Sequence, residues 1–169
     1  MEVRVCIRNL DWEENCALME EAWFALPVCS DDLRETIGLD EDSGSYIITD
    51  FEFPIDINEQ ESVEGINYLY QQVKALEDSH IYSGLSDLLR SGYFGSIDEL
   101  VREKGNIRFW HGCTELSDVA FEKVKAGHFG ELDAFWYPFL RYNALANYLY
   151  TIGGSAYIAS SKGYFEYVH

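Results

Sequence analysis

The spacing of apolar residues predicts short strands in the first third of the chain. Residues 3–7 (VRVCI) alternate apolar and polar side chains with the period of two that is typical of a half-buried strand. Residues 22–28 (AWFALPV) and 46–57 (YIITDFEFPIDI) are two further strand candidates. Between these two, residues 31–37 predict a short helix that stops at Gly38, because glycine readily adopts the left-handed conformation that ends helices. We therefore expect a small antiparallel sheet with one helix.

The third strand candidate sorts its side chains by parity. Four apolar residues and three acids fall on opposite parities, namely Phe51, Phe53, Ile55 and Ile57 against Asp50, Glu52 and Asp56. An extended backbone would bury the first set and display the carboxylates in a row, about 6.6 Å apart. Pro54 marks a sheet edge or the end of the strand.

Apolar residues at helical spacing predict helices in the rest of the chain, the first capped by Ser62. The helix candidates cover residues 63–76, 81–90, 97–103, 115–126 and 138–151, and short strands are expected at 107–110, 155–159 and 164–168. The fold class that we expect is α+β, in three parts. These are an acidic N-terminal α+β domain at 1–61, a central helical domain at 62–104 and an aromatic-rich C-terminal α+β domain at 105–169.

Charge is distributed unevenly along the 169 residues. The chain has 30 Asp and Glu residues against 12 Lys and Arg, a formal net charge of −18 with histidine neutral. Residues 1–64 hold 18 of the acids and three bases, a charge of −15, whereas residues 65–169 sum to −3. This balance excludes non-specific binding to nucleic acid or to an anionic membrane, because both require a Lys/Arg surface.

The acids of the first third are dense enough to imitate nucleic-acid phosphates. Between residues 11 and 64 there are 17 acids and a single base, Arg34. Carboxylates on every second strand residue or every helical turn lie about 5 to 7 Å apart, and B-DNA carries a phosphate every 3.4 Å or so along each strand. The pattern favours a mimic of duplex DNA, with a merely solvated acidic face as the alternative. The acids expected to form the mimic surface are Asp31, Asp32, Glu35, Asp40, Glu41, Asp42, Asp50, Glu52, Asp56, Glu59, Glu61 and Glu64.

The sequence offers little that could carry catalysis. It contains no motif for nucleotide binding, serine hydrolysis or zinc proteolysis, and its four cysteines lack CxxC spacing. His111 and Cys113 place an imidazole near a thiol, which leaves a nucleophilic pair open as a minor alternative. The turn at 40–45 (DEDSGS) fails as an EF-hand, since Ser45 and Phe51 stand where Gly and Glu are needed. We expect a protein that is not an enzyme, with no catalytic residue, no cofactor and no metal ion.

Aromatic residues concentrate near the end of the chain, with eight of them between residues 129 and 150. Tyrosine and tryptophan are enriched at interfaces, so a dimer interface is one interpretation and an aromatic core with tyrosines at its margin is the other. The candidate interface residues are Phe135, Trp136, Tyr137 and Tyr142.

Targeting signals are not evident in the sequence. No run approaches the roughly 20 apolar residues that span a bilayer. The first 15 residues lack the basic start and apolar core of a signal peptide. The expected location is the cytoplasm.

Several segments in order resemble one known family. They are Asn9 and Leu10 after the first strand, AWFALPV at 22–28, ETIGLDED at 35–42, ITDFEFPI at 48–55, the helix with Glu64, Asn67 and Leu69, and GYFEYV at 163–168. Together they resemble the ArdA family of antirestriction proteins, which plasmids, conjugative transposons and phages carry. The likeness extends over essentially the whole chain.

The resemblance implies an elongated three-domain protein that dimerises through its C-terminal domains and imitates bent B-DNA. It implies that the protein acts in the bacterial host cell, where it occupies the DNA site of the methyltransferase core of type I restriction-modification enzymes and inhibits restriction or modification. The alternative is an acidic module that sequesters another basic DNA-binding protein. Because residues 65–169 are nearly neutral, we expect the middle of the dimer to imitate DNA less well than its ends.

Overall fold

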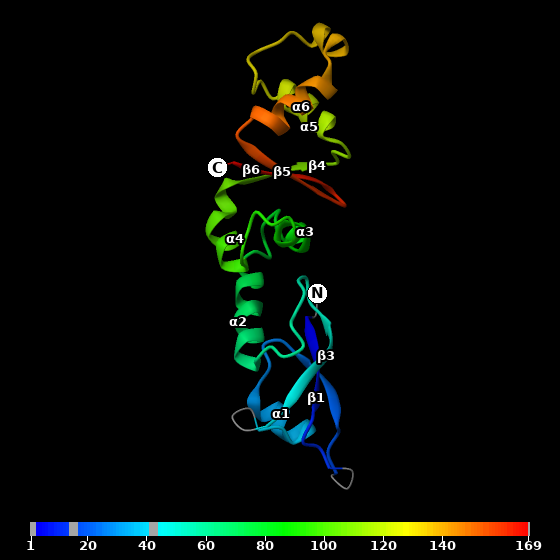
Figure 1. Cartoon of the computed structure of the whole chain (residues 1–169), viewed down its shortest axis with the longest axis vertical. Coiled ribbons are helices and arrows are strands. Elements are labelled where there is room, and N and C mark those ends of the chain that lie inside the picture. Colours follow the sequence, from blue (N-terminus) through cyan, green and yellow to red (C-terminus); the bar gives the residue numbers. More distant parts are fainter. Residues whose placement is uncertain (1–2, 14–16, 41–43, 169) are drawn as a thin grey trace. The chain divides into compact units, whose positions relative to one another are not determined.

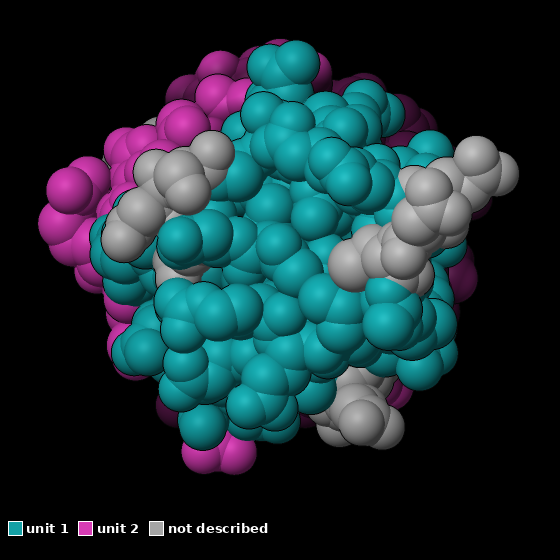
Figure 2. Space-filling model, turned by 90° about the horizontal axis from the view of Figure 1, so that it is seen from below, with its two compact units in different colours: residues 1–77 teal, residues 78–169 magenta. Residues whose placement is uncertain are grey.

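The computed structural model describes residues 3–13, 17–40 and 44–168. The chain forms two compact units, 1–77 and 78–169, which Figure 2 colours teal and magenta. Each unit contains a three-stranded antiparallel sheet (Figure 1). The fold class is α+β, as the sequence predicted. The division into three domains at 1–61, 62–104 and 105–169 stays a prediction. Among the described residues, no helix is long and apolar enough to cross a membrane.

The first unit is built on a sheet with the strand order β2-β1-β3. Its strands are β1 (Arg4–Asn9), β2 (Glu21–Ala25) and β3 (Tyr46–Glu52). Strand β1 is the central strand and pairs antiparallel with both neighbours. The period-two pattern read from the sequence therefore found the central strand correctly.

The acidic strand differs from its prediction in two ways. Its pairing with β1 shifts register at Thr49, an extra residue that makes a β-bulge. The strand also ends at Glu52 and not at residue 57, because Pro54 has no N–H to donate to a ladder. Ile55 and Ile57 are buried, as their parity predicted, although they lie outside the strand.

Helix α1 (Ser30–Ile37) packs its apolar side onto the sheet. Leu33 and Ile37 are fully buried, and the helix ends at Gly38 with a φ of +66°, the left-handed residue that was predicted there. The cluster around them draws on both sides of the sheet–helix interface and includes Val5, Ile7, Phe24, Leu26, Val28, Leu39, Ile48, Ile57, Val63 and Ile66. This core positions every acid of α1 toward solvent.

Helix α2 (Val63–Lys74) follows, with Ser62 as its predicted N-cap. The Ser62 hydroxyl accepts a hydrogen bond from the Gly65 N–H at 3.0 Å. Asn67 ties the helix to the connection between β2 and α1. Its Oδ1 accepts from the Val28 N–H at 2.7 Å, and its Nδ2 donates to the Val28 carbonyl at 2.9 Å.

The second unit is built on a sheet with the strand order β4-β6-β5. Its strands are β4 (Ile107–His111), β5 (Ser155–Ser160) and the central β6 (Gly163–Val168). The remaining elements of the unit are helical, and they are η1 (Tyr82–Gly84), α3 (Leu85–Arg90), α4 (Ile97–Glu103), η2 (Lys104–Asn106), α5 (Leu116–Lys125), η3 (Ala134–Phe139) and α6 (Tyr142–Ile152). The helix predicted over 138–151 thus begins at Tyr142, after a separate 3₁₀ turn that contains Pro138.

Helices cover both faces of this second sheet (Figure 1). On one face, Phe165 lies against Gly84, where a Cβ atom would be 2.2 Å from its ring. On the other face, Tyr157 packs against the small buried cluster that joins α5 and α6. Strand β6 is therefore covered on both faces, and the adjacent residues Phe165 and Glu166, of opposite parity, are both buried.

Asn67→Ala is expected to lower the free energy of unfolding by about 1 to 3 kcal/mol, because it leaves the N–H and C=O of Val28 without their partner. Urea unfolding monitored by circular dichroism measures this. Gln71→Ala, at an exposed position of the same helix, is the matched control and should change stability by less than about 0.5 kcal/mol. Equal effects of the two substitutions would contradict the assignment.

Candidate functional site

The acids predicted to form the mimic surface lie on α1, on β3 and on the segment that leads into α2. Ten of the twelve are within the described residues, whereas Glu41 and Asp42 lie outside them. Nine of the ten are exposed and Glu61 is half-buried. The sequence therefore predicted their exposure well. Their electrostatic surroundings divide them into two groups.

On α1 the acids stand in the first two turns. Asp31 and Asp32 lie at the N-terminus, where the helix dipole favours negative charge, and Glu35 follows one turn later. Arg34 forms an ion pair with Asp31 at 3.4 Å, but both side chains are largely exposed, so the pair is weak. The helix thus displays net negative charge to solvent.

On β3 the charge is partly neutralised. Both carboxylate oxygens of Glu52 accept hydrogen bonds from the Arg4 guanidinium, each at 2.8 Å. The same guanidinium lies 4.7 Å from the centre of the Trp23 ring, which fixes its position. Hydrogen bonds from Arg4 lower the pKa of Glu52 below its usual range. Glu52 is exposed as predicted, yet it carries its own counter-charge.

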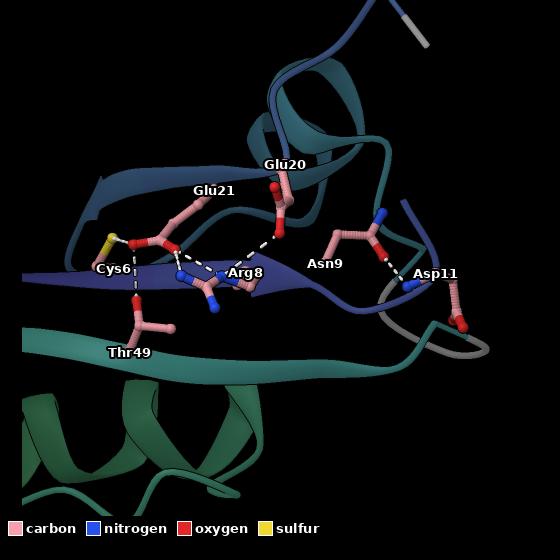
Figure 3. Close-up of polar contacts among 7 residues, drawn as sticks. All are labelled: Cys6, Arg8, Asn9, Asp11, Glu20, Glu21 and Thr49. Atoms are coloured by element: carbon pink, nitrogen blue, oxygen red, sulfur yellow. Dashed lines mark hydrogen bonds and ion pairs between the residues drawn. The ribbon is translucent and has the colours of Figure 1, made fainter. Parts of the chain in front are cut away.

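A second arginine, Arg8 of β1, neutralises a glutamate on β2 (Figure 3). Glu21 accepts from Cys6 Sγ at 3.2 Å, from Arg8 Nε at 2.7 Å and from Thr49 Oγ1 at 3.0 Å. These three hydrogen bonds, that of Cys6 first, lower the pKa of Glu21. Arg8 also lies 3.7 Å from Glu20. The solvent face of the sheet is therefore a network of arginines and carboxylates.

Five of the predicted acids keep a charge that no described residue compensates. Asp32, Glu35, Asp40, Glu59 and Glu64 are exposed and form no ion pair with any residue that the structure describes. They belong to α1, to the loop after it and to the approach and first turn of α2. On the strand that gave the sharpest pattern in the sequence, Glu52 is paired with Arg4, whereas Asp50 is exposed and forms no ion pair with a described residue.

The aromatic residues near the end of the chain form an exposed cluster on η3. Phe135, Trp136 and Phe139 are 66%, 53% and 68% exposed, and their ring centres lie 5.3 to 6.2 Å apart. Exposed aromatic rings gathered in this way make the cluster a candidate interaction site. The sequence-based set contained Phe135 and Trp136 but missed Phe139.

Tyr137 and Tyr142, also in that set, have a different place. Both are half-buried, and Tyr142 donates its hydroxyl proton to the Tyr137 carbonyl at 2.8 Å. Each ring makes an edge contact with Phe121 of α5, at 6.2 and 5.2 Å between centres. These two tyrosines hold the exposed cluster onto α5 and contribute little exposed surface themselves.

The geometry gives no support to a nucleophilic pair at His111 and Cys113. Cys113 is buried, and burial raises the pKa of its thiol, with Asp118 and Glu122 adding to the shift. A thiol in this setting stays protonated and is a poor nucleophile. The described residues also contain no group of three or more His, Cys, Asp or Glu that could hold a metal ion.

Comparison with known families decides the identity of the chain. A family model for the antirestriction protein ArdA matches residues 14–167. The chain belongs to the ArdA family. Membership assigns it an antirestriction function, in a family of non-catalytic inhibitors of restriction-modification enzymes. A search of curated proteins gave no match.

Glu21 should make part of the stability of the first unit depend on pH. Its pKa lies below the ordinary 4.5, so its hydrogen bonds stabilise the fold above pH 4.5, and this contribution is lost as the pH falls through the lowered value. We expect Glu21→Gln to be less stable than the natural chain at pH 7 and the difference to shrink toward pH 3. Urea unfolding across this range measures both.

The control for this prediction is Glu35→Gln, which removes an acid without an ion pair among the described residues. It should not lower the free energy of unfolding at pH 7. A difference for Glu21→Gln that stays constant from pH 7 to pH 3 contradicts the role given to this carboxylate.

Proposed function

We propose that the chain is a DNA mimic that occupies the DNA-binding groove of type I restriction-modification enzymes and so blocks their access to DNA. The observation that carries the proposal is the exposed acidic surface of the first unit, in a chain of an antirestriction family. This target places its site of action in the bacterial cytoplasm.

The proposal rests on electrostatics of the kind that governs DNA binding. A groove that binds duplex DNA is lined by Lys and Arg, which gain affinity by releasing counterions from the phosphates. On α1, Asp31, Asp32 and Glu35 offer a folded substitute spaced by about one helical turn of 5.4 Å, and Glu64 adds one carboxylate at the start of α2. Contacts to phosphates position a protein without reading the base sequence, so a mimic of phosphates alone can compete with any duplex.

Not every acid contributes equally to the proposed mimicry. Glu21 and Glu52 already face Arg8 and Arg4, so an enzyme groove would meet a largely compensated surface there. The uncompensated acids of α1, of the loop after it and of the start of α2 are the better match for a basic groove. We propose that these form the contact surface.

The second unit has a separate part in the proposal. We propose that two copies associate through the aromatic cluster of Phe135, Trp136 and Phe139, which would give one particle with two acidic units. At protein interfaces, most of the affinity comes from large aromatic side chains that are removed from water on binding. Their high exposure in a single chain supports this assignment.

The contact surface can be tested with two variants of equal charge. Asp32→Asn/Glu35→Gln/Glu64→Gln removes three uncompensated carboxylates, and Glu20→Gln/Glu21→Gln/Glu52→Gln removes three that face arginines. If each uncompensated carboxylate contributes about 0.7 kcal/mol, the first variant should weaken inhibition of a type I enzyme about 30-fold. The second should weaken it less than about threefold. Equal losses would show that only total charge matters.

The proposed association can be measured by sedimentation equilibrium. Trp136→Ala/Phe139→Ala should raise the dissociation constant of the dimer by about 30-fold, the effect of losing roughly 2 kcal/mol at an interface hot spot. The control is Leu10→Ala, at an exposed apolar position of the first unit, and it should leave the constant unchanged. A natural chain that is monomeric at micromolar concentration contradicts the proposal.

A further inference from the structure

A buried ionic network in the second unit is not explained by acidic mimicry. Glu166 of β6 is 2% exposed and Lys123 of α5 is 6% exposed, and the two form a hydrogen-bonded ion pair. The second oxygen of Glu166 accepts from Trp110 Nε1 at 2.9 Å. Tyr157 donates its hydroxyl proton, at 3.0 Å, to the oxygen that also accepts from Lys123. One carboxylate thus joins α5 to all three strands of the sheet.

The network is costly as a source of stability alone. Removing two charges from water carries a penalty that their attraction often fails to recover, and apolar residues of similar size commonly stabilise as well or better. Burial would by itself raise the pKa of Glu166, yet hydrogen bonds from Lys123 and Trp110 and the charge of Lys123 bring it below its usual range. The carboxylate is therefore held in its charged form by directed bonds.

Directed bonds matter here because the apolar side chains that α5 buries fully are small. Apart from Lys123, the residues that α5 buries fully are Val119, Ala120 and Val124, and Leu116 packs half-buried against the cluster with α6. Apolar contacts are non-directional, so by themselves they do little to fix the register of the helix on the sheet. The Lys123 ammonium removes this freedom, because it also lies over the Trp110 and Tyr157 rings at 5.4 and 5.6 Å.

Helix α5 in turn carries the exposed aromatic cluster. Phe121, two residues before Lys123, makes the edge contacts with Tyr137 and Tyr142 that hold η3 in place. A shift of α5 along the sheet would displace Phe121 and with it the three exposed rings.

We propose that Lys123 and Glu166 are positioning residues that fix α5 on the sheet and thereby set the arrangement of the aromatic cluster on η3. Only the consequence for dimerisation rests on the proposed self-association. The structural claim concerns a single chain and can be tested whether or not the chain dimerises.

The experiment compares Glu166→Gln with the double variant Lys123→Met/Glu166→Gln in the full chain. The single variant leaves a buried ammonium without its counter-charge and should be clearly less stable. The double variant removes both charges and keeps one amide oxygen to accept from Trp110, while the Tyr157 hydroxyl can accept from the amide nitrogen, so it should recover most of the thermal stability. Both variants lack the ion pair between Lys123 of α5 and Glu166 of β6, so both should loosen η3.

Amide hydrogen exchange at low protein concentration reads out the position of η3. In the natural chain the Leu140 N–H donates to the Tyr137 carbonyl at 3.3 Å and the Trp136 N–H to the Asp133 carbonyl at 2.9 Å. Exchange of these two amides should accelerate at least threefold in both variants. The control is Glu122→Gln, which removes the exposed ion pair with Lys125 on the same helix and should leave both rates unchanged.

Sedimentation equilibrium on the same proteins gives the second readout. The dimer constant of the double variant should rise at least tenfold although its stability has recovered. Recovery of exchange rates and dimer constant together with stability would overturn the proposal, because the pair would then be purely structural. If the natural chain is monomeric while the exchange rates still change, self-association fails and the positioning role stands.

Discussion

The excess of carboxylates in the first 77 residues is the constraint on which the rest of the molecule depends. These residues hold 19 acids against four bases, and like charges at this density repel one another and oppose folding. A small sheet and two helices must bury enough apolar surface to offset this repulsion. The structure meets the constraint with a mostly apolar inner face, on which the buried Asn9 donates to the Ile37 carbonyl, and with arginines on the solvent face of β1, where Arg4 and Arg8 each face a glutamate.

This arrangement separates stability from surface charge. Arginines on the central strand neutralise Glu52 and Glu21, while α1 and the start of α2 keep acids with no such partner among the described residues. In the second unit the charges nearly balance, and one acid and one base are buried against each other. The acidic surface proposed for mimicry is thereby confined to the first unit, and the second unit keeps a nearly balanced charge.

Local periodicity predicted most of the elements and the exposure of the acids, because strand parity and helical spacing depend only on neighbouring residues. It did not predict the bulge at Thr49, nor that Glu52 would meet Arg4, since both follow from the register of strands more than 40 residues apart. The burial of Glu166 and its pairing with Lys123 could not be predicted for a similar reason. An acid between Phe165 and Tyr167 on a short strand suggests an exposed position, and its lysine partner lies 43 residues away on a helix.

The central claim is that the chain and duplex DNA bind the same groove. Equilibrium binding of the labelled chain to the methyltransferase core of a type I enzyme, repeated at rising concentrations of a target duplex and at two salt concentrations, tests it most directly. The account predicts mutually exclusive binding, with an apparent dissociation constant for the chain that rises in proportion to the duplex concentration. The affinity of the chain for the enzyme should also fall steeply as salt is raised. A ternary complex of enzyme, duplex and chain would contradict it.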